Sequence, residues 1–267
     1  MYIVFDIGGS KIRFARSDDL RSFSEPIIKE NPHKYTDAIV LIKEMIDQLA
    51  GRESIKGIAG GVAGIIDPET GNLVFAPNMK DWVGKPLTND IKRITGVMPK
   101  IFNDTQVGGL GEAVFGAGTD ERAVAYITAS TGIGGSITVD KKIQAHKYSF
   151  EPGHQIIDYK NGTTLESLIG GRQLEEKYSK KPQDLDQNIW NEVTKILAIG
   201  LHNSFVHWSP DILVVGGSLM HKIRIEDLRS YLKKSLDGMY PDNLKIAQSK
   251  LGDLNGLYGA MAYLRDR

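Results

Sequence analysis

The chain has 267 residues, of which 25% are charged and 41% hydrophobic, as in ordinary globular domains. Its 33 basic and 33 acidic residues give a formal charge of zero, which argues against nucleic-acid binding and against binding to anionic membranes. The sequence contains no cysteine, so disulfides, thiolate zinc sites and cysteine nucleophiles are excluded. No apolar run reaches the ~18 residues of a membrane span and no cleavable leader opens the chain, so we expect a cytoplasmic protein.

The N-terminal half alternates strand-like and helical patterns. Two short runs of apolar or alternating residues, at 2–7 and 11–16, flank the turn Gly8-Gly9-Ser10, which is typical of a β-hairpin. The elements expected after it are a strand at 25–29, a helix at 35–50, a strand at 55–66, a loop at 67–90, a strand at 99–103 and a helix at 105–115. This alternation of strands and helices predicts an α/β fold.

The opening pattern returns in the second half of the chain. A strand-like run at 123–130 is followed by the glycine-rich turn Thr131-Gly132-Ile133-Gly134-Gly135-Ser136 and by a second strand at 137–143. The remaining expected elements are a polar stretch at 179–188, a helix at 189–207, a strand at 211–215 that ends in Gly216-Gly217-Ser218, and a helix at 254–266. The repeat predicts two similar domains, each beginning with a β-hairpin whose turn is rich in glycine.

The glycine turns are candidate phosphate-binding sites, because glycine lets the main chain approach a ligand and consecutive N–H groups can bind an anion. At the first turn Ser10 adds a hydroxyl, Lys11 a positive charge, and Asp6 a carboxylate able to hold Mg²⁺ directly or through water. A tight turn with an exposed lysine explains the same residues. The second turn offers Thr131 in place of the lysine. A third pair, Gly216-Gly217, follows an apolar strand, where a nucleoside can lie against the main chain.

A second group of residues carries carboxylates and an imidazole. Asn103-Asp104 stand where a strand is expected to end and a helix to begin, so they either cap the helix or supply a general base. Glu151-Pro152-Gly153-His154 and Glu166 lie in a loop-like region. Their carboxylates and imidazole are able to hydrogen-bond the hydroxyls of a sugar, and the alternative is that they are ordinary exposed polar residues.

In this order the motifs resemble the ROK family of sugar kinases and sugar-responsive repressors, which are members of the actin-like ATPase superfamily. The resemblance runs over nearly the whole chain. The segments that carry it are 6–11 (family pattern D-x-G-G-[ST]-K), 59–64 (G-x-P-G, with alanine for proline), 76–78 with Trp82 and Pro86-Leu87, Asn103-Asp104, 131–135, 151–154 (E-x-G-H), Glu166 and 211–218.

The resemblance implies two actin-like (ribonuclease H-like) domains with a cleft between them, residues 1–105 with 254–267 forming the first and 106–253 the second. It implies ATP-dependent phosphorylation of a hexose, glucose before others, at the 6-hydroxyl, by a homodimeric enzyme that uses Mg²⁺. Fructose, mannose or an N-acetylhexosamine are alternative substrates. A catalytically silent sugar-binding regulator and a polymerising actin-like protein are the alternatives from other classes.

The resemblance also implies a role for individual residues of the motifs. It implies that Asp104 is the catalytic base. The residues implied to bind sugar are Gly64, Asn78, Asn103, Asp104, Glu151, His154 and Glu166. Those implied to bind ATP and its phosphates are Asp6, Gly8, Gly9, Ser10, Lys11, Thr131, Gly132, Gly134, Gly135, Gly216 and Gly217, with Asp6 also beside the Mg²⁺.

The chain departs from the family between His154 and Glu166. Most members carry a zinc-binding cysteine cluster there, whereas residues 155–165 contain no cysteine. We therefore expect no zinc site, and His154 is not implied as a metal ligand. The sequence leaves open what braces this segment in place of the metal.

Overall fold

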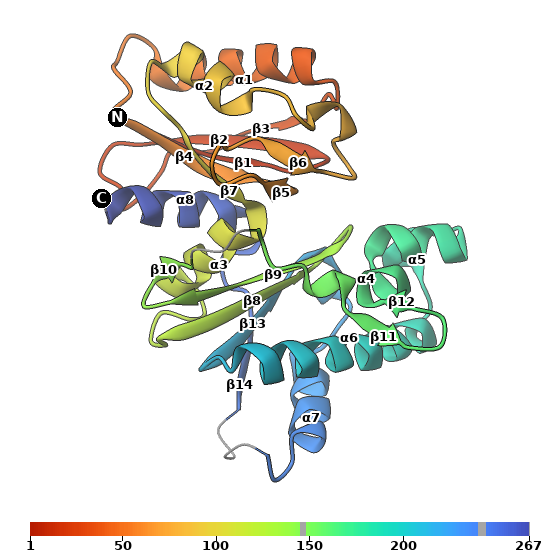
Figure 1. Cartoon of the computed structure of the whole chain (residues 1–267). Helices are drawn as coiled ribbons and strands as arrows, with labels where there is room; N and C mark the ends of the chain where they lie inside the picture. Colours follow the sequence, from red (N-terminus) through yellow and green to blue (C-terminus); the bar gives the residue numbers. More distant parts are fainter. Residues whose placement is uncertain (145–147, 240–243, 267) are drawn as a thin grey trace.

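Two five-stranded sheets form the framework of the protein in the computed structural model, which describes residues 1–144, 148–239 and 244–266 (Figure 1). The first sheet has the order β3-β2-β1-β4-β7 and the second the order β10-β9-β8-β13-β14. In each sheet the hairpin strands pair antiparallel, and two later strands join in parallel beside the first strand. The shared order confirms the predicted duplication and the α/β class.

The strand bounds follow the predicted pattern closely at the first hairpin, whereas the second strand of the second hairpin begins four residues earlier than expected. The first sheet consists of β1 (Tyr2–Ile7), β2 (Lys11–Ser17), β3 (Ile27–Glu30), β4 (Gly57–Val62) and β7 (Lys100–Asn103). The second consists of β8 (Ala123–Ala129), β9 (Ile133–Val139), β10 (Lys142–Ile143), β13 (Ile212–Gly216) and β14 (Lys245–Gln248). β13 is apolar and buried on both faces, as expected for a strand covered by helices on either side, and β1 is apolar except for Asp6 near its end.

Helices separate and cover the two sheets (Figure 1). On the outer face of the first sheet lie α1 (Tyr35–Ala50) and α2 (Leu87–Thr95), and on the outer face of the second lie α6 (Gln187–Trp208) and α7 (Ile225–Ser235). Between the sheets, α3 (Asp104–Phe115) packs against α8 (Asn255–Arg265). Both of these helices also contact β4 of the first sheet, and α3 contacts β8 and β9 of the second.

The crossing of α3 and α8 depends on small residues and on one buried carboxylate. A Cβ at Gly259 would lie 1.7 Å from the carbonyl oxygen of Val107, so only glycine permits this approach. Beside the crossing, the Glu112 side chain is fully buried and accepts hydrogen bonds from the Ser249 hydroxyl and from the main-chain N–H of Leu251, Lys250 and Ala117. Glu112 thus ties α3 to the segment that leads into α8.

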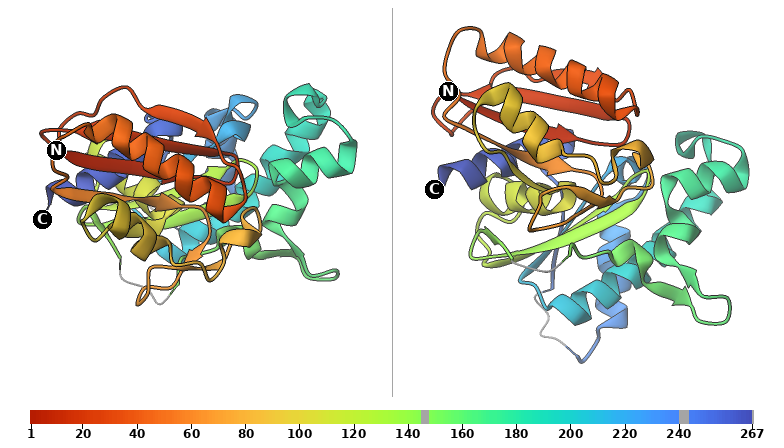
Figure 2. Two further views of the ribbon diagram at one scale, coloured as in Figure 1. Left: turned by 90° about the horizontal axis from the view of Figure 1, so that it is seen from above. Right: turned by 45° about the horizontal axis from the view of Figure 1, so that its top comes forward.

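A smaller group of elements projects from the side of the second sheet (Figure 2). It consists of the 3-10 turn η2 (Pro152–His154), the hairpin β11 (Ile156–Asp158) and β12 (Thr163–Thr164), α4 (Leu165–Ile169), α5 (Gly171–Tyr178) and η3 (Pro182–Asp184). Two further 3-10 turns, η4 (Ser218–His221) and η5 (Gly252–Leu254), follow β13 and β14. Within the described ranges, no helix is long and apolar enough to cross a membrane.

Three of the expected elements were wrong in part. The expected strand at 55–66 breaks at Gly64, whose φ of 133° ends the pairing, and resumes as β5 (Ile65–Ile66). The expected loop at 67–90 contains β6 (Leu73–Phe75), η1 (Lys80–Trp82) and the start of α2, short elements that a polar composition conceals. The expected strand at 137–143 turns at Asp140-Lys141, which both have positive φ.

The second glycine turn is also shorter than expected. Gly134 and Gly135 belong to β9, where they pair with Thr128 and Ile127, so the turn itself comprises only residues 130–132. The absence of side chains serves packing here. A Cβ at Gly134 would lie 2.6 Å from a Thr105 methyl carbon, and one at Gly135 would lie 2.8 Å from a ring carbon of Pro152.

Candidate active site

Asn103 and Asp104 stand where β7 ends and α3 begins, as predicted. Asn103 is the N-cap residue: its side-chain oxygen accepts the N–H of Thr105 at 2.9 Å, and Gln106 completes a capping box. The Asn103 amide also donates to the carbonyl oxygen of Gly64 at 2.9 Å. The capping role is therefore present, and it fixes Asn103 against the loop that contains Gly64 while leaving Asp104 at the positive end of the helix.

Two other carboxylates, those of Asp6 and Glu151, lie close enough to Asp104 to interact with its charge. Loss of solvent around the half-buried Asp104 carboxyl raises its pKa to about 6, and the negative charge of Asp6 adds to this rise. Burial likewise raises the pKa of Glu151 to about 7, with further contributions from Asp104 and Glu166. These effects place Asp6 of β1 and Glu151 before η2 within electrostatic range of Asp104 of α3, and Glu166 of α4 within range of Glu151.

Asp6 has a cationic partner that the sequence motif did not reveal. The β1–β2 register puts Asp6 directly opposite Arg13, whose Nη1 lies 3.0 Å from Oδ2 of Asp6. Burial raises the pKa of Asp6, and the Arg13 guanidinium opposes that rise. The other oxygen, Oδ1, accepts no hydrogen bond from the described residues. The short hairpin connection sets this register, so the pair was predictable from the turn.

Glu166 is anchored on the second hairpin. Its Oε2 accepts the N–H of Ile133 at 2.7 Å, and a Cβ at Gly132 would lie 2.6 Å from the same oxygen. η2 is equally close to this hairpin, because a Cβ at Gly153 would lie 2.2 Å from the carbonyl oxygen of Ile133. The structure therefore brings Glu151 and Glu166 together on β9, while the side chain of His154, at the end of η2, is exposed.

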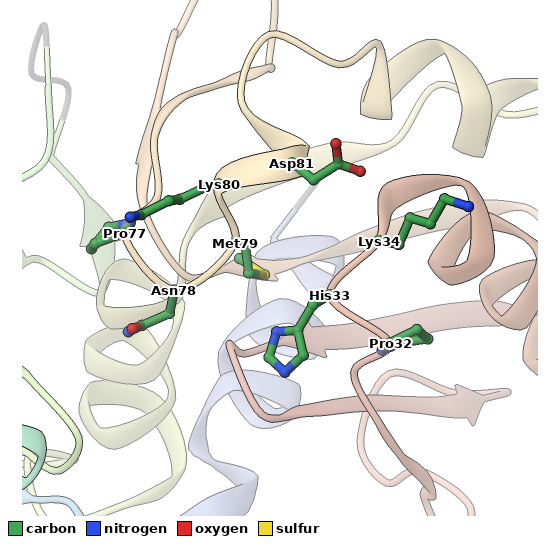
Figure 3. Close-up of a pocket in the computed structure, with 8 residues that line it drawn as sticks. All are labelled: Pro32, His33, Lys34, Pro77, Asn78, Met79, Lys80 and Asp81. Atoms are coloured by element: carbon green, nitrogen blue, oxygen red, sulfur yellow. The ribbon is translucent and has the colours of Figure 1, made fainter.

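Asn78 lies at the mouth of the site, against the first glycine turn. A Cβ at Gly9 would lie 2.8 Å from Cβ of Asn78, so this turn and the segment before η1 are in close contact. Asn78 also lines a shallow pocket of about 490 Å³, together with Pro32, His33, Lys34, Pro77, Met79, Lys80 and Asp81 (Figure 3). From α5, Nη1 of Arg172 approaches Oδ1 of Asn78 to 3.5 Å.

A second cavity, of about 480 Å³, lies between the two glycine turns. Ser10 lines it from the first hairpin. The rest of the lining comprises Ser130, Thr131, Gly171, Arg172, Glu175, Pro182, Gln183, Trp190, Ser218, Leu219, His221 and Lys222. Lys11 is exposed at the start of β2 beside it. The structure thus gathers Ser10 and Thr131 on one cavity, as the duplication suggested.

The two glycine pairs next to this cavity have structural roles of their own. The first turn is closed by the N–H of Gly8, which donates to the carbonyl oxygen of Lys11 at 2.8 Å. Gly216 is buried, and a Cβ there would lie 2.9 Å from the hydroxyl of Tyr126. Gly217 has a φ of 95°, and a Cβ there would lie 2.2 Å from the carbonyl oxygen of Ala129. Ser218, and neither glycine, lines the cavity.

Sequence reasoning missed several cavity residues, chiefly Arg172, Trp190, His221 and Lys222. Arg172 follows the glycine pair that starts α5, which is the one local signal available. Trp190 belongs to α6, His221 is the last residue of η4, and Lys222 follows it. They reach the cavity through the packing of elements distant in sequence.

Comparison with known proteins decides the family. The ROK family model matches residues 2–267. The chain belongs to the ROK family. It is 25% identical to a glucokinase from Thermotoga maritima over 98% of this chain and 96% of that protein. It is 26% identical to a xylose repressor from Caldicellulosiruptor bescii over 79% of this chain and 62% of the repressor.

The solved structures of ROK proteins agree with the fold described above. The crystal structure of a ROK family glucokinase from Streptomyces griseus, in complex with glucose and AMPPNP, matches with a TM-score of 0.84 at 21% identity and covers 100% of this chain and 99% of that one. This match confirms the predicted actin-like fold. Unlike the cysteine-bearing members, this ROK protein has no cysteine. In the part of the chain that the structure describes, no three His, Asp or Glu side chains gather as a metal site.

Proposed function

We propose that this ROK protein is an ATP-dependent kinase that phosphorylates a hexose, with glucose as the first candidate, at the 6-hydroxyl. The observation that carries the proposal is Asp104, a half-buried carboxyl between the two sheets with a pKa of about 6. That pKa lies near the pH at which a general base is most effective. Further support comes from the glucokinase relative and from the glucose and AMPPNP bound to the Streptomyces griseus enzyme.

In the proposed reaction Asp104 accepts the proton of the sugar 6-hydroxyl while that oxygen attacks the γ-phosphorus of ATP. The new O–P bond forms as the bond between the γ-phosphorus and the β,γ-bridging oxygen breaks, and ADP leaves. Glu151, Glu166, Asn78 and Asn103 hold the sugar hydroxyls, so that the reacting oxygen is already placed. Catalysis of this kind depends on positioning and electrostatics rather than on a covalent intermediate.

The proposed ATP site is the cavity lined by Ser10 and Thr131, whose hydroxyls and neighbouring main-chain N–H groups face the phosphates. The donor set beside it fits Mg²⁺: Asp6 uses Oδ2 for Arg13 and keeps Oδ1 for a cation or its water, and both hydroxyls are hard oxygen donors. Bound with ATP, Mg²⁺ supplies positive charge to the phosphate oxygens.

Release of ADP from Mg-ATP, measured across glucose, fructose, mannose and the N-acetylhexosamines, tests this function. We expect one sugar to stimulate release far above the background without sugar, and ³¹P–¹³C coupling in the product to identify oxygen 6 as the phosphorylated atom. If no sugar stimulates ADP release by folded protein that binds ATP, the kinase proposal is wrong.

A sugar-binding regulator is the second candidate, because a xylose repressor is among the relatives. It predicts sugar binding with no sugar-dependent ADP release, so the same assay separates the two. The raised pKa of Asp104 favours the kinase, since a regulator has no use for a poised base. We further propose that the enzyme is a cytoplasmic homodimer, which sedimentation and cell fractionation test.

A further inference from the structure

The segment that carries the proposed sugar-binding carboxylates is joined to α6 by one side chain, Gln155. Its amide nitrogen donates to the carbonyl oxygens of Pro152, at 2.8 Å, and Gly200, at 3.3 Å. Its amide oxygen accepts from the side-chain amide of Asn203 at 2.8 Å. Pro152 belongs to η2, whereas Gly200 and Asn203 belong to α6. Both ends of the Gln155 amide are therefore engaged by groups that lie 45 and 48 residues further along the chain.

Gln155 also fixes the second half of the segment. Its main-chain carbonyl oxygen accepts the N–H of Leu165 at 3.0 Å, at the point where α4 begins. Leu165 is buried against α6, since a Cβ at Gly200 would lie 2.3 Å from its side chain. Glu166 directly follows Leu165. On the other side, η2 directly precedes Gln155, and Glu151 directly precedes η2. One glutamine thus sits between the two stretches that hold these carboxylates.

We infer that Gln155 and Asn203 form a metal-free clamp that positions Glu151 and Glu166 for the sugar. The inference rests on the proposed kinase function and adds to it a pair of positioning residues that touch no substrate. A side-chain amide is chemically suited to this role, because it both donates and accepts, fixes three groups at once and gives each bond a defined direction. The sequence offers no thiolate through which a metal could hold the segment instead.

The clamp should affect sugar binding and not ATP binding. This difference separates it from a general contribution to stability. Neither Gln155 nor Asn203 lines the cavity between the glycine turns, so the proposed ATP contacts do not depend on them. Loss of one side-chain bond in the clamp should loosen Glu151 and Glu166 together. We therefore expect the Gln155→Ala and Asn203→Ala variants to bind sugar about tenfold more weakly, with the affinity for ATP within about twofold of the wild type.

The test measures sugar KM, ATP KM and the calorimetric Kd for the best sugar in both variants and in the double variant. Gln187→Ala is the matched control, because that glutamine sits at the exposed start of α6 and, among the described residues, its side-chain amide donates to Asn191 alone. The double variant should bind sugar about as weakly as Gln155→Ala alone, since that substitution already removes the bond to Asn203 together with those to Pro152 and Gly200. Amide hydrogen exchange over residues 151–169 should be faster in all three than in the control.

Sugar affinity and amide exchange equal to those of the Gln187→Ala control would overturn the clamp. Equal losses of sugar and ATP affinity would also overturn it, since they would indicate general destabilisation. A wild type that binds sugar but releases no ADP would refute the kinase, and sugar affinity would still decide on the clamp. A wild type that binds no sugar at all would overturn both the kinase and the role of the clamp in sugar binding.

Discussion

Acid should switch off the proposed phosphoryl transfer at an unusually high pH, because the pKa of Asp104 is about 6. An aspartate with the ordinary pKa of 3.8 would stay ionised across the neutral range. Burial is the main cause of the rise and the charge of Asp6 the second, whereas the N–H of Thr105 works in the opposite direction. Only the ionised carboxylate can accept a proton, so kcat/KM should increase with pH and level off above the midpoint.

The size of the effect follows from that midpoint. About nine-tenths of Asp104 is ionised at about pH 7 and about one-tenth at about pH 5, so kcat/KM should fall roughly tenfold between them. Glu151, with a pKa of about 7, titrates in the same range and interacts with Asp104, so the wild-type profile describes the pair. Glu151→Gln keeps the shape of the protonated glutamate and removes its titration. The pH dependence of kcat/KM in this variant should therefore follow the titration of Asp104.

The assay is direct chromatographic measurement of ADP, which avoids coupling enzymes that fail in acid. Fluorescence should show that the protein remains folded at each pH. Asp6→Asn provides a second check: without the Asp6 charge the pKa of Asp104 falls, so the midpoint should move to lower pH even though turnover also drops. A flat profile between about pH 5 and about pH 7 in both the wild type and Glu151→Gln would refute the assignment of Asp104 as the base.

Three further predictions concern stability and packing. Asp104→Asn should raise the free energy of unfolding at about pH 8 by up to about 3 kcal/mol, with no gain below about pH 4, because the folded state then carries no desolvated charge. Urea denaturation showing the same difference between variant and wild type at both pH values would contradict this. Glu112→Ala should lower the free energy of unfolding by about 3 kcal/mol or more, because three main-chain N–H groups lose their acceptor. The control Glu69→Ala, at an exposed position, should leave it unchanged. Equal urea midpoints for the two variants would show that Glu112 does not anchor α3. Gly132→Ala should raise the sugar KM by displacing Glu166, and an unchanged KM would contradict that contact.

Much of the framework could be predicted because it is local. Apolar runs on both sides of a short glycine turn predict a hairpin, and two such hairpins predicted the duplicated sheets that the structure contains. The expected loop at 67–90 was wrong for a physical reason. α2 has three apolar residues, Leu87, Ile91 and Ile94, among six polar ones, and its nine residues give too short a periodic pattern for the helix to be recognised.

The residues of the candidate site could be proposed from the sequence, but its geometry could not. Motif order indicated that Asp104, Glu151 and Glu166 belong together, yet the raised pKa values of Asp104 and Glu151 depend on burial and on distances that no spacing encodes. Arg172 and the Gln155 clamp had no clear signal in the sequence, since each depends on contact with a distant element. Such contacts arise only when η2, α5 and α6 pack.

The measurement that tests the central claim most directly compares wild type and Asp104→Asn in one experiment, with sugar affinity by calorimetry and turnover by ADP release. The substitution keeps the shape of the side chain and removes only the base. We predict sugar affinity within about threefold of the wild type and turnover lower by about 10²–10⁴. Full turnover in Asp104→Asn would contradict the proposed mechanism, since the hydroxyl proton would then have another acceptor.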